Sequence, residues 1–193
     1  MNLTNSSFTY TVPAMSVVTF AGQGNTPPGF GSVFDQTANP GVTLLVTNNA
    51  SDSDLPAQTL TFAAGKTFPT NATISSASGV FSWRPLVSHA NTTNLVQVVV
   101  TDSGQPNLSA TNSFNVMVNP ISPPVMSSIT VNGGEIELLV DGPSGPDYSL
   151  FTSTNLVDWE PVLTVTSPVP PVTLEDTNFP NGPVRFYRIQ LGP

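Results

Sequence analysis

The sequence predicts an all-β protein built from antiparallel β-sandwiches. Apolar residues alternate with polar ones in short runs, as at Val96, Val98 and Val100, which is the period of a strand with one buried face. The 20 prolines and 14 glycines, with many Ser, Thr and Asn residues, supply turns between these runs. No long stretch places apolar residues at helical spacing. The chain should therefore be a series of short strands joined by turns.

Residues 1–22 are expected to form a strand pair left from an upstream β-sandwich. Phe8, Tyr10 and Val12 would share one strand face, and Val18 and Phe20 another. A two-stranded hairpin is only marginally stable by itself, so this pair must pack on another part of the protein. Residues 23–31 (QGNTPPGFG) then have the composition of a linker.

Residues 32–119 are expected to form the first complete sandwich. Short alternating runs follow one another here with turn clusters such as NNASDSDLP and DSGQPN between them, a spacing typical of antiparallel sandwiches. The runs are 44–46, 60–62, 80–83, 96–100 and 114–118.

A Pro-rich linker at 120–125 should be extended and stiff. Residues 126–193 repeat the strand pattern and predict a second, smaller sandwich of six or seven strands. Its runs begin at 129 and continue at 136–140, 148–153, 162–165, 172–174 and 184–191. A domain of this size buries a small core, so we expect it to lean on its neighbour.

Composition excludes several function classes. The net charge is −8, from 4 Lys and Arg against 12 Asp and Glu, which argues against nucleic acid or an anionic membrane as partner. The chain has no cysteine, so thiol nucleophiles, disulfides and thiolate metal sites are excluded. The single histidine, His89, rules out a multi-histidine zinc site and is expected at the surface. No run of apolar residues is long enough for a membrane span.

Three segments carry a resemblance to known families. The motifs DSDLP, GVFSWRP and TDSGQPNLSAT occur in order within 32–119, which resembles a bacterial cadherin-like or Ig-like repeat. The elements STNLVDW and RFYRI make 126–193 similar to the small fibronectin-like modules that close secreted bacterial hydrolases. The segment SFTYTVPAMSVVTFAG resembles the last strands of the sandwich that follows the barrel in several glycoside hydrolases. Together these likenesses imply the non-catalytic tail of a secreted bacterial polysaccharide-degrading enzyme.

The cadherin-like resemblance implies a calcium site. The positions that match its ligands are Asp52, Asp54 and Asp102, and carboxylate oxygens suit calcium. The chain departs from the family pattern, because SWRPLVSHAN has no glutamate and NPISPPV has no aspartate. The alternative is that these three aspartates cap turns by accepting hydrogen bonds from backbone N–H groups.

The enzyme-tail resemblance also implies a polysaccharide as partner. We expect an outer-face row of Trp159, Tyr148 and Phe186 to form an aromatic platform for sugar rings, whereas Trp83 should lie in the core. The alternative is that all three fill the small core or the contact between the domains.

Catalysis within this chain is not expected. Glu135 and Glu137 share a strand face at a spacing of about 6.5–7 Å, but the surrounding VNGGEIELLVDG indicates a solvated strand rather than a cleft. We therefore predict an extracellular accessory region that positions an upstream catalytic domain, binds polysaccharide, or does both. The alternative is a pure spacer or a calcium-rigidified adhesion-type module without glycan binding.

Overall fold

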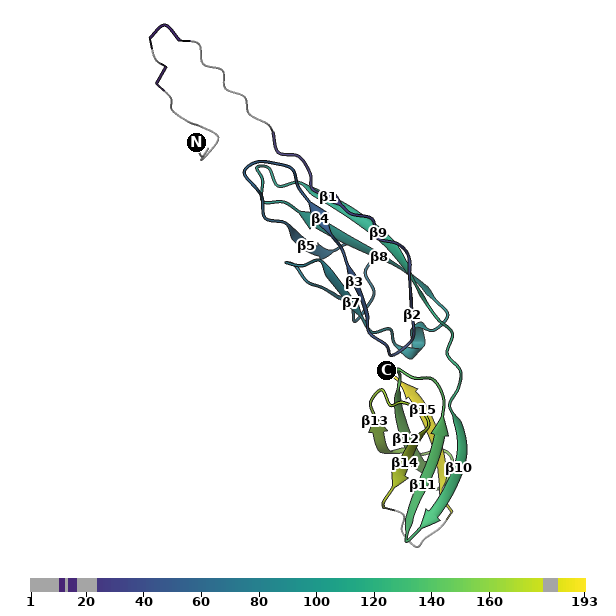
Figure 1. The fold of residues 1–193 in the computed structure, drawn as a ribbon. Coiled ribbons are helices and arrows are strands. Elements are labelled where there is room, and N and C mark those ends of the chain that lie inside the picture. Colours follow the sequence, from purple (N-terminus) through teal and green to yellow (C-terminus); the bar gives the residue numbers. More distant parts are fainter. Residues whose placement is uncertain (1–10, 13, 17–23, 179–183) are drawn as a thin grey trace.

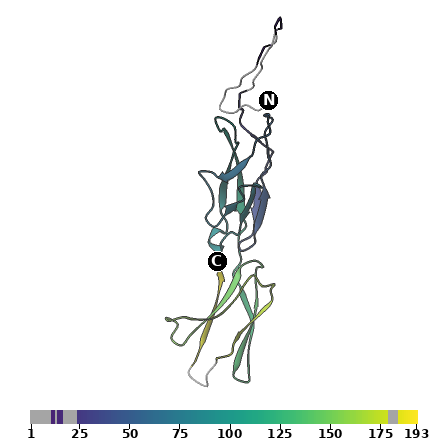
Figure 2. The same ribbon diagram turned by 90° about the vertical axis from the view of Figure 1, so that its left-hand side faces the viewer.

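The computed structural model describes residues 11–12, 14–16, 24–178 and 184–193. Within these residues the chain is almost entirely β-structure, as the sequence predicts, with one 3₁₀ turn at Val87–His89 and no α-helix. Two sandwiches follow one another end to end (Figures 1 and 2). The predicted strand pair at 1–22 lies almost wholly outside the described residues.

The first sandwich contains β1 to β9, in chain order Gly29–Phe30, Gln36–Ala38, Leu44–Thr47, Ala50–Ser51, Thr61–Ala64, Thr73–Ile74, Val80–Trp83, Thr93–Thr101 and Ser109–Val118. One sheet has the order β2-β9-β8-β5 and the facing sheet the order β3-β7-β6, while β1 and β4 pair separately. The pairing of β2 with β9 is parallel, and the others are antiparallel.

Alternation along the long strands fills the core of the first sandwich. Val96, Val98 and Val100 point inward from β8 and are fully buried, and Phe81 stacks edge-on against Phe114 at 5.7 Å between ring centroids. Trp83 is also fully buried, as expected, and its indole N–H donates to the Thr70 carbonyl at 3.0 Å. This hydrogen bond satisfies the one polar atom that Trp83 brings into the core.

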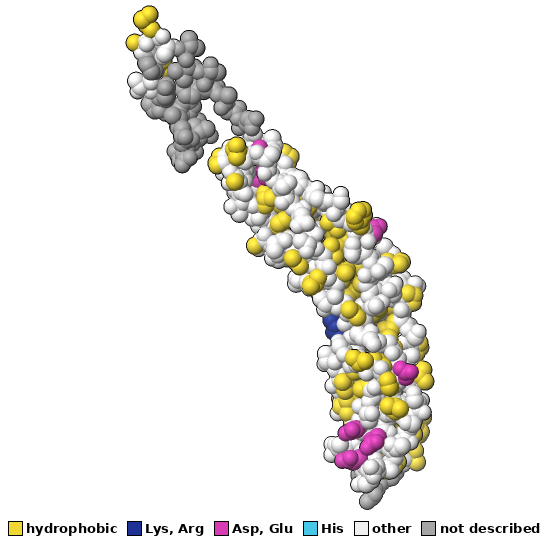
Figure 3. Space-filling view, viewed as in Figure 1, with side chains coloured by type: hydrophobic (Ala, Val, Ile, Leu, Met, Phe, Trp, Pro, Cys, Tyr) yellow, Lys and Arg dark blue, Asp and Glu magenta, His cyan; other side chains and the backbone are white. Residues whose placement is uncertain are grey.

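The second sandwich has six strands: β10 Val125–Asn132, β11 Glu135–Asp141, β12 Asp147–Ser153, β13 Glu160–Val165, β14 Val172–Asp176 and β15 Phe186–Gly192. They form two three-stranded sheets, β10-β11-β14 and β13-β12-β15. Its core is a separate cluster built on Leu138, Val140, Leu150 and Leu174. Acidic side chains gather on the outer face of this sandwich (Figure 3), where Glu137 of β11 lies opposite Glu175 of β14.

Candidate functional site

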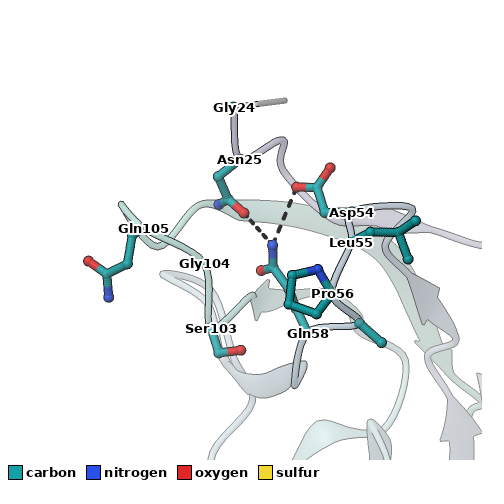
Figure 4. A pocket seen from close by; sticks show the side chains of 10 residues that line it. Gly24, Asn25, Asp54, Leu55, Pro56, Gln58, Ser103, Gly104 and Gln105 are labelled. Atoms are coloured by element: carbon teal, nitrogen blue, oxygen red, sulfur yellow. Dashed lines mark hydrogen bonds between the residues drawn. The ribbon is translucent and has the colours of Figure 1, made fainter. Parts of the chain in front are cut away.

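Loops at one end of the first sandwich bring the three predicted aspartates together with residues 24–26. Figure 4 shows this end, where a cavity of about 360 Å³ lies between the 54–58 loop, the 103–105 turn and Asn25. Gln58 reaches across it and donates from its amide to Asn25 and, at 3.4 Å, to Asp54. The end of the sandwich is therefore tied together by amide and carboxylate side chains.

Asp102 organises the turn that follows β8. Its carboxylate accepts hydrogen bonds from the backbone N–H of Gly104 at 2.9 Å and of Leu108 at 3.0 Å, and from the Asn25 amide at 3.0 Å. The side chain is only 3% exposed. Burial acts to raise the pKa of Asp102, but the hydrogen bonds from Leu108, Gly104 and Asn25 together outweigh it, and the pKa lies below its ordinary value.

Asp54 and Asp52 also accept hydrogen bonds that hold the loops at this end of the sandwich. Asp54 accepts hydrogen bonds from the backbone N–H of Thr26 at 2.6 Å and from the Thr26 hydroxyl at 2.8 Å. Asp52 caps the same loop, because its Oδ1 accepts from the N–H of Asp54 at 2.9 Å. The bonds from Thr26 to Asp54 and from Asn25 to Asp102 hold residues 25 and 26 on the sandwich, so the aspartates act as turn caps and anchors.

The donor set does not fit calcium as it stands. Both oxygens of Asp102 and both of Asp54 face N–H or O–H donors, which a cation would have to displace. The buried oxygens here that lack a partner are Asp52 Oδ2 and Gln58 Oε1, far fewer than the six to eight ligands that calcium takes. Among the described residues no three acidic or histidine side chains converge as a metal site would require.

The expected aromatic row is wrong at Tyr148. This side chain is fully buried in the core of the second sandwich, and its hydroxyl donates to the Pro143 carbonyl at 2.9 Å. The reason lies in the strand alternation, since Tyr148 and Leu150 share the inward face of β12. Tyr148 therefore belongs to the core, as the alternative interpretation had it.

A different aromatic cluster occupies the outer face of this sheet. Phe151 of β12 lies opposite Arg188 of β15, and the Arg188 guanidinium sits 4.9 Å from the Phe151 ring centroid and 4.6 Å from that of Trp159. Trp159 is half-buried against this cation. Phe186 is half-buried too and lies opposite Ser153. Sequence reasoning missed Phe151 and Arg188, although their cross-strand pairing follows from the register of the two strands.

His89 is not a free surface residue. It ends the 3₁₀ turn at Val87–His89, its Nδ1 accepts a hydrogen bond from the backbone N–H of Leu86 at 3.1 Å, and its ring packs edge-on against Trp83 at 5.3 Å. Half-buried in this way, it covers the end of the first core that lies nearer the second sandwich. Glu135 is exposed on the outer face of β11, where the sequence places it.

Arg84 joins the two sandwiches. Its Nε donates to the Gly41 carbonyl of the first sandwich at 2.7 Å. Its Nη2 donates across the junction to the Gly145 carbonyl at 3.1 Å, to Asp147 at 2.9 Å and to the Ser167 hydroxyl at 3.0 Å. The Arg84–Asp147 ion pair is partly shielded, with side chains 30% and 17% exposed. One planar guanidinium thus bridges two domains, a geometry that lysine cannot copy.

Two glycines let the backbones meet beside this arginine. Gly41 and Gly145 both have positive φ angles, +76° and +115°. A Cβ atom at Gly41 would collide with the backbone of Gly145 and Pro146, and one at Gly145 would fall 2.6 Å from a methyl group of Val42. The N–H of Val87 also donates to the Pro193 carbonyl at 3.0 Å. The junction is therefore a fitted contact between domains.

Comparison with known proteins supports an Ig-like domain in the first sandwich. Residues 27–119 match the family model described as "Putative Ig domain". No curated protein matches the sequence. Within the described residues, no helix is long and apolar enough to cross a membrane.

Solved structures give weaker likenesses. The extracellular domain of protocadherin GammaB4 is 17% identical with a TM-score of 0.41, and the match covers 67% of this chain and 27% of that one. The third cadherin domain of human protocadherin 7 is 19% identical at a TM-score of 0.38, covering 52% and 92%. Sidekick-1 immunoglobulin domains 1–5 are 12% identical at 0.41, covering 86% and 36%. The chain spans less than half the length of the protocadherin GammaB4 structure.

Asp102 gives the apical loops a pH dependence. Its pKa is lowered in the folded state, so its stabilising effect is complete above the ordinary value of 3.8 and is lost as the pH falls through the folded value. We expect Asp102→Asn to lower the melting temperature at pH 7, and this deficit to shrink as the pH drops below 3.8. Thermal melts across this range measure it. Glu135→Gln, at an exposed position, is the control. A deficit that stays constant down to about pH 2 contradicts the role given to Asp102.

Proposed function

We propose that this chain is a stiff, non-catalytic spacer in a larger secreted bacterial protein. By the resemblance of its sequence, that protein is a polysaccharide-degrading enzyme. The observation that carries the spacer function is the Arg84 junction, where one side chain donates to Gly41 of the first sandwich and to three groups of the second. A fixed junction sets both the distance and the direction between whatever precedes the first sandwich and whatever contacts the second.

Stiffness has a direct functional use. Two sites held on one rigid body meet their targets at an effective concentration set by the spacing, whereas a flexible joint spreads the same sites over a larger volume. The anchoring of Asn25 and Thr26 on Asp102 and Asp54 extends the ordered structure toward the N-terminal segment. Both ends of the first sandwich therefore restrain the chain that leaves them.

Glycan binding is the second candidate function. It is favoured by the outer face of the β13-β12-β15 sheet, where the Phe151 and Trp159 rings flank the exposed Arg188 guanidinium. Aromatic rings bind apolar faces and guanidinium groups donate to hydroxyl or carboxylate oxygens. Arg188 covers part of both rings, so a sugar would contact the combined surface rather than a bare platform.

The spacer function predicts that Arg84 controls inter-domain motion. The chain has no cysteine, so spin labels can be attached through Thr61→Cys and Thr173→Cys, at exposed positions on β5 and β14. Pulsed electron spin resonance should give one narrow inter-label distance for the otherwise native chain. Arg84→Ala should broaden it severalfold, because four hydrogen bonds are lost.

Arg188→Ala is the matched control for that experiment, because it removes an arginine that lies away from the junction. The control should leave the distance distribution narrow. A broad distribution in the otherwise native chain, or no change in Arg84→Ala, would refute the rigid-spacer proposal.

A module rigidified by calcium would become more stable when calcium is added, whereas the proposed spacer needs no metal. If calcium bound Asp52, Asp54 and Asp102, it would stabilise the native state and raise the melting temperature, and the rise would grow with the logarithm of the free calcium concentration above its Kd. Because the carboxylates of Asp54 and Asp102 already accept hydrogen bonds, we expect the melting temperature to be the same in millimolar calcium and in excess chelator. A calcium-dependent rise that disappears in Asp102→Asn would establish the metal site instead.

Glycan binding is tested by retention of the whole chain on a panel of insoluble polysaccharides. Trp159→Ala should abolish any retention while leaving the melting temperature within a few degrees, because Trp159 is only half-buried. Leu139→Ala, at an exposed position on the other sheet, is the control and should be retained. Absence of retention by the native sequence removes the glycan function and leaves the spacer function alone.

A further inference from the structure

β10 carries an inward-facing apolar row that the second sandwich leaves uncovered. Val131 lies opposite Ile136 of β11, Ile129 opposite Leu138, and Met126 opposite Val140. Directly opposed residues of neighbouring strands point to the same face of a sheet. The three β11 residues are buried in the core, at 5% exposure or less, yet Met126, Ile129 and Val131 are 39%, 52% and 66% exposed.

The uncovered row lies on the side of the sandwich where β10 and β15 are the edge strands, which we call the open side. β13 and β14 contact each other and close the opposite side. The strand orders β10-β11-β14 and β13-β12-β15 therefore place β10 and β15 at the two free edges of the open side. In Figure 3, apolar side chains line the surface on the side where Figure 1 draws β10.

β15 also lacks a neighbour on this side. Its inward residues Tyr187, Ile189 and Leu191 pack on the core, but each remains only partly buried. Its outer edge presents backbone N–H and C=O groups that pair with no strand among the described residues. A strand added beside β15 would pair with this edge and, in the same position, cover the row on β10.

β10 shows few of the devices that usually protect an exposed edge. Natural edge strands are commonly shortened or carry charged residues or proline. β10 is eight residues long and holds no charged residue and no proline, and its one irregularity is a bulge between Met126 and Ser128. An uncharged strand of this length with an exposed apolar row is open to cover by another segment.

One strand is the smallest element that can pair with the β15 edge. A strand takes up about 4.8 Å in the hydrogen-bonding direction of a sheet. Pairing of this kind is strand addition, in which main-chain hydrogen bonds give affinity and alternate side chains give specificity.

We propose that the N-terminal segment 6–12 of a second copy of this chain supplies the strand. Phe8, Tyr10 and Val12 alternate in SSFTYTV, seven residues that match the seven of β15. Residues 1–22 contain no charged side chain, so the segment would bury no charge against the uncharged row on β10. Most of this segment lies outside the described residues, and Val12, which is described, is 54% exposed.

The geometry favours donation between copies over donation within one chain. Residues 24–26 join the first sandwich at the end remote from the second sandwich (Figure 1). A head-to-tail contact brings the N-terminal segment of one copy to the second sandwich of the next without a path back along its own first sandwich. Such a contact is heterologous and does not close on itself, so it builds linear assemblies.

Sedimentation of the full chain over a range of concentrations tests the proposal. We expect concentration-dependent association that disappears when residues 1–22 are deleted. It should also disappear in Ile129→Lys, which places a charge in the uncovered row at a position exposed enough to leave the fold intact. Thr130→Lys, the neighbouring exposed residue on the outward face, is the matched control and should associate normally.

A synthetic peptide of sequence NSSFTYTV, residues 5–12, provides the second readout. It should bind the chain that lacks residues 1–22 and raise its melting temperature, and Ile129→Lys should abolish this binding. A monomeric full chain that also fails to bind the peptide overturns the proposal. Association that survives the deletion of 1–22 but not Ile129→Lys overturns the choice of segment, and association that survives Ile129→Lys overturns the site.

Discussion

The Arg84 guanidinium is the interaction on which the arrangement of the whole chain depends. Each sandwich has its own core, and along the chain only the Pro-rich segment 120–124 joins them. The Arg84 donors point to both domains, with Gly41 on one side and Gly145, Asp147 and Ser167 on the other, and we propose that these bonds hold one relative orientation. Hydrogen bonds to a charged group contribute about 1.5–3 kcal/mol each before coupling among them is considered.

The two glycines at the junction let the two backbones come close enough for Arg84 to donate hydrogen bonds to both domains. A side chain at Gly41 or Gly145 would hold the backbones apart and move the carbonyl groups away from Arg84. The contact consequently depends on a strict backbone geometry at these two positions. Asn25, Asp54 and Asp102 do the same for the other end of the first sandwich, where amide and carboxylate groups fix an entering segment that has little apolar surface to bury. Polar contacts at both ends of the first sandwich suit the proposed function of holding neighbouring domains at a fixed distance and direction.

Much of the fold could be predicted from the sequence, because alternation with period two sets which residues are buried. The runs around Val96 and Leu138 became β8 and β11, and Trp83 lies in the core. The prediction for Tyr148 is wrong, because Tyr148 alternates with the buried Leu150 and so lies on the inward face of β12. Arg84 could not be recognised, since its partners lie 43 to 83 residues away in the chain. The three aspartates lie in the loops at one end of the first sandwich, and the choice between turn caps and metal ligands depends on hydrogen-bond donors such as Asn25 and Thr26, which are distant in the sequence.

We propose that the two sandwiches move as one body. Nuclear magnetic resonance relaxation of backbone ¹⁵N nuclei measures it directly, because each domain reports its own rotational correlation time. A rigid pair predicts a single anisotropic tumbling tensor that fits both sandwiches, with a correlation time suited to 20.2 kDa. Separate, shorter correlation times for residues 27–119 and 125–192 would show that the two sandwiches move independently.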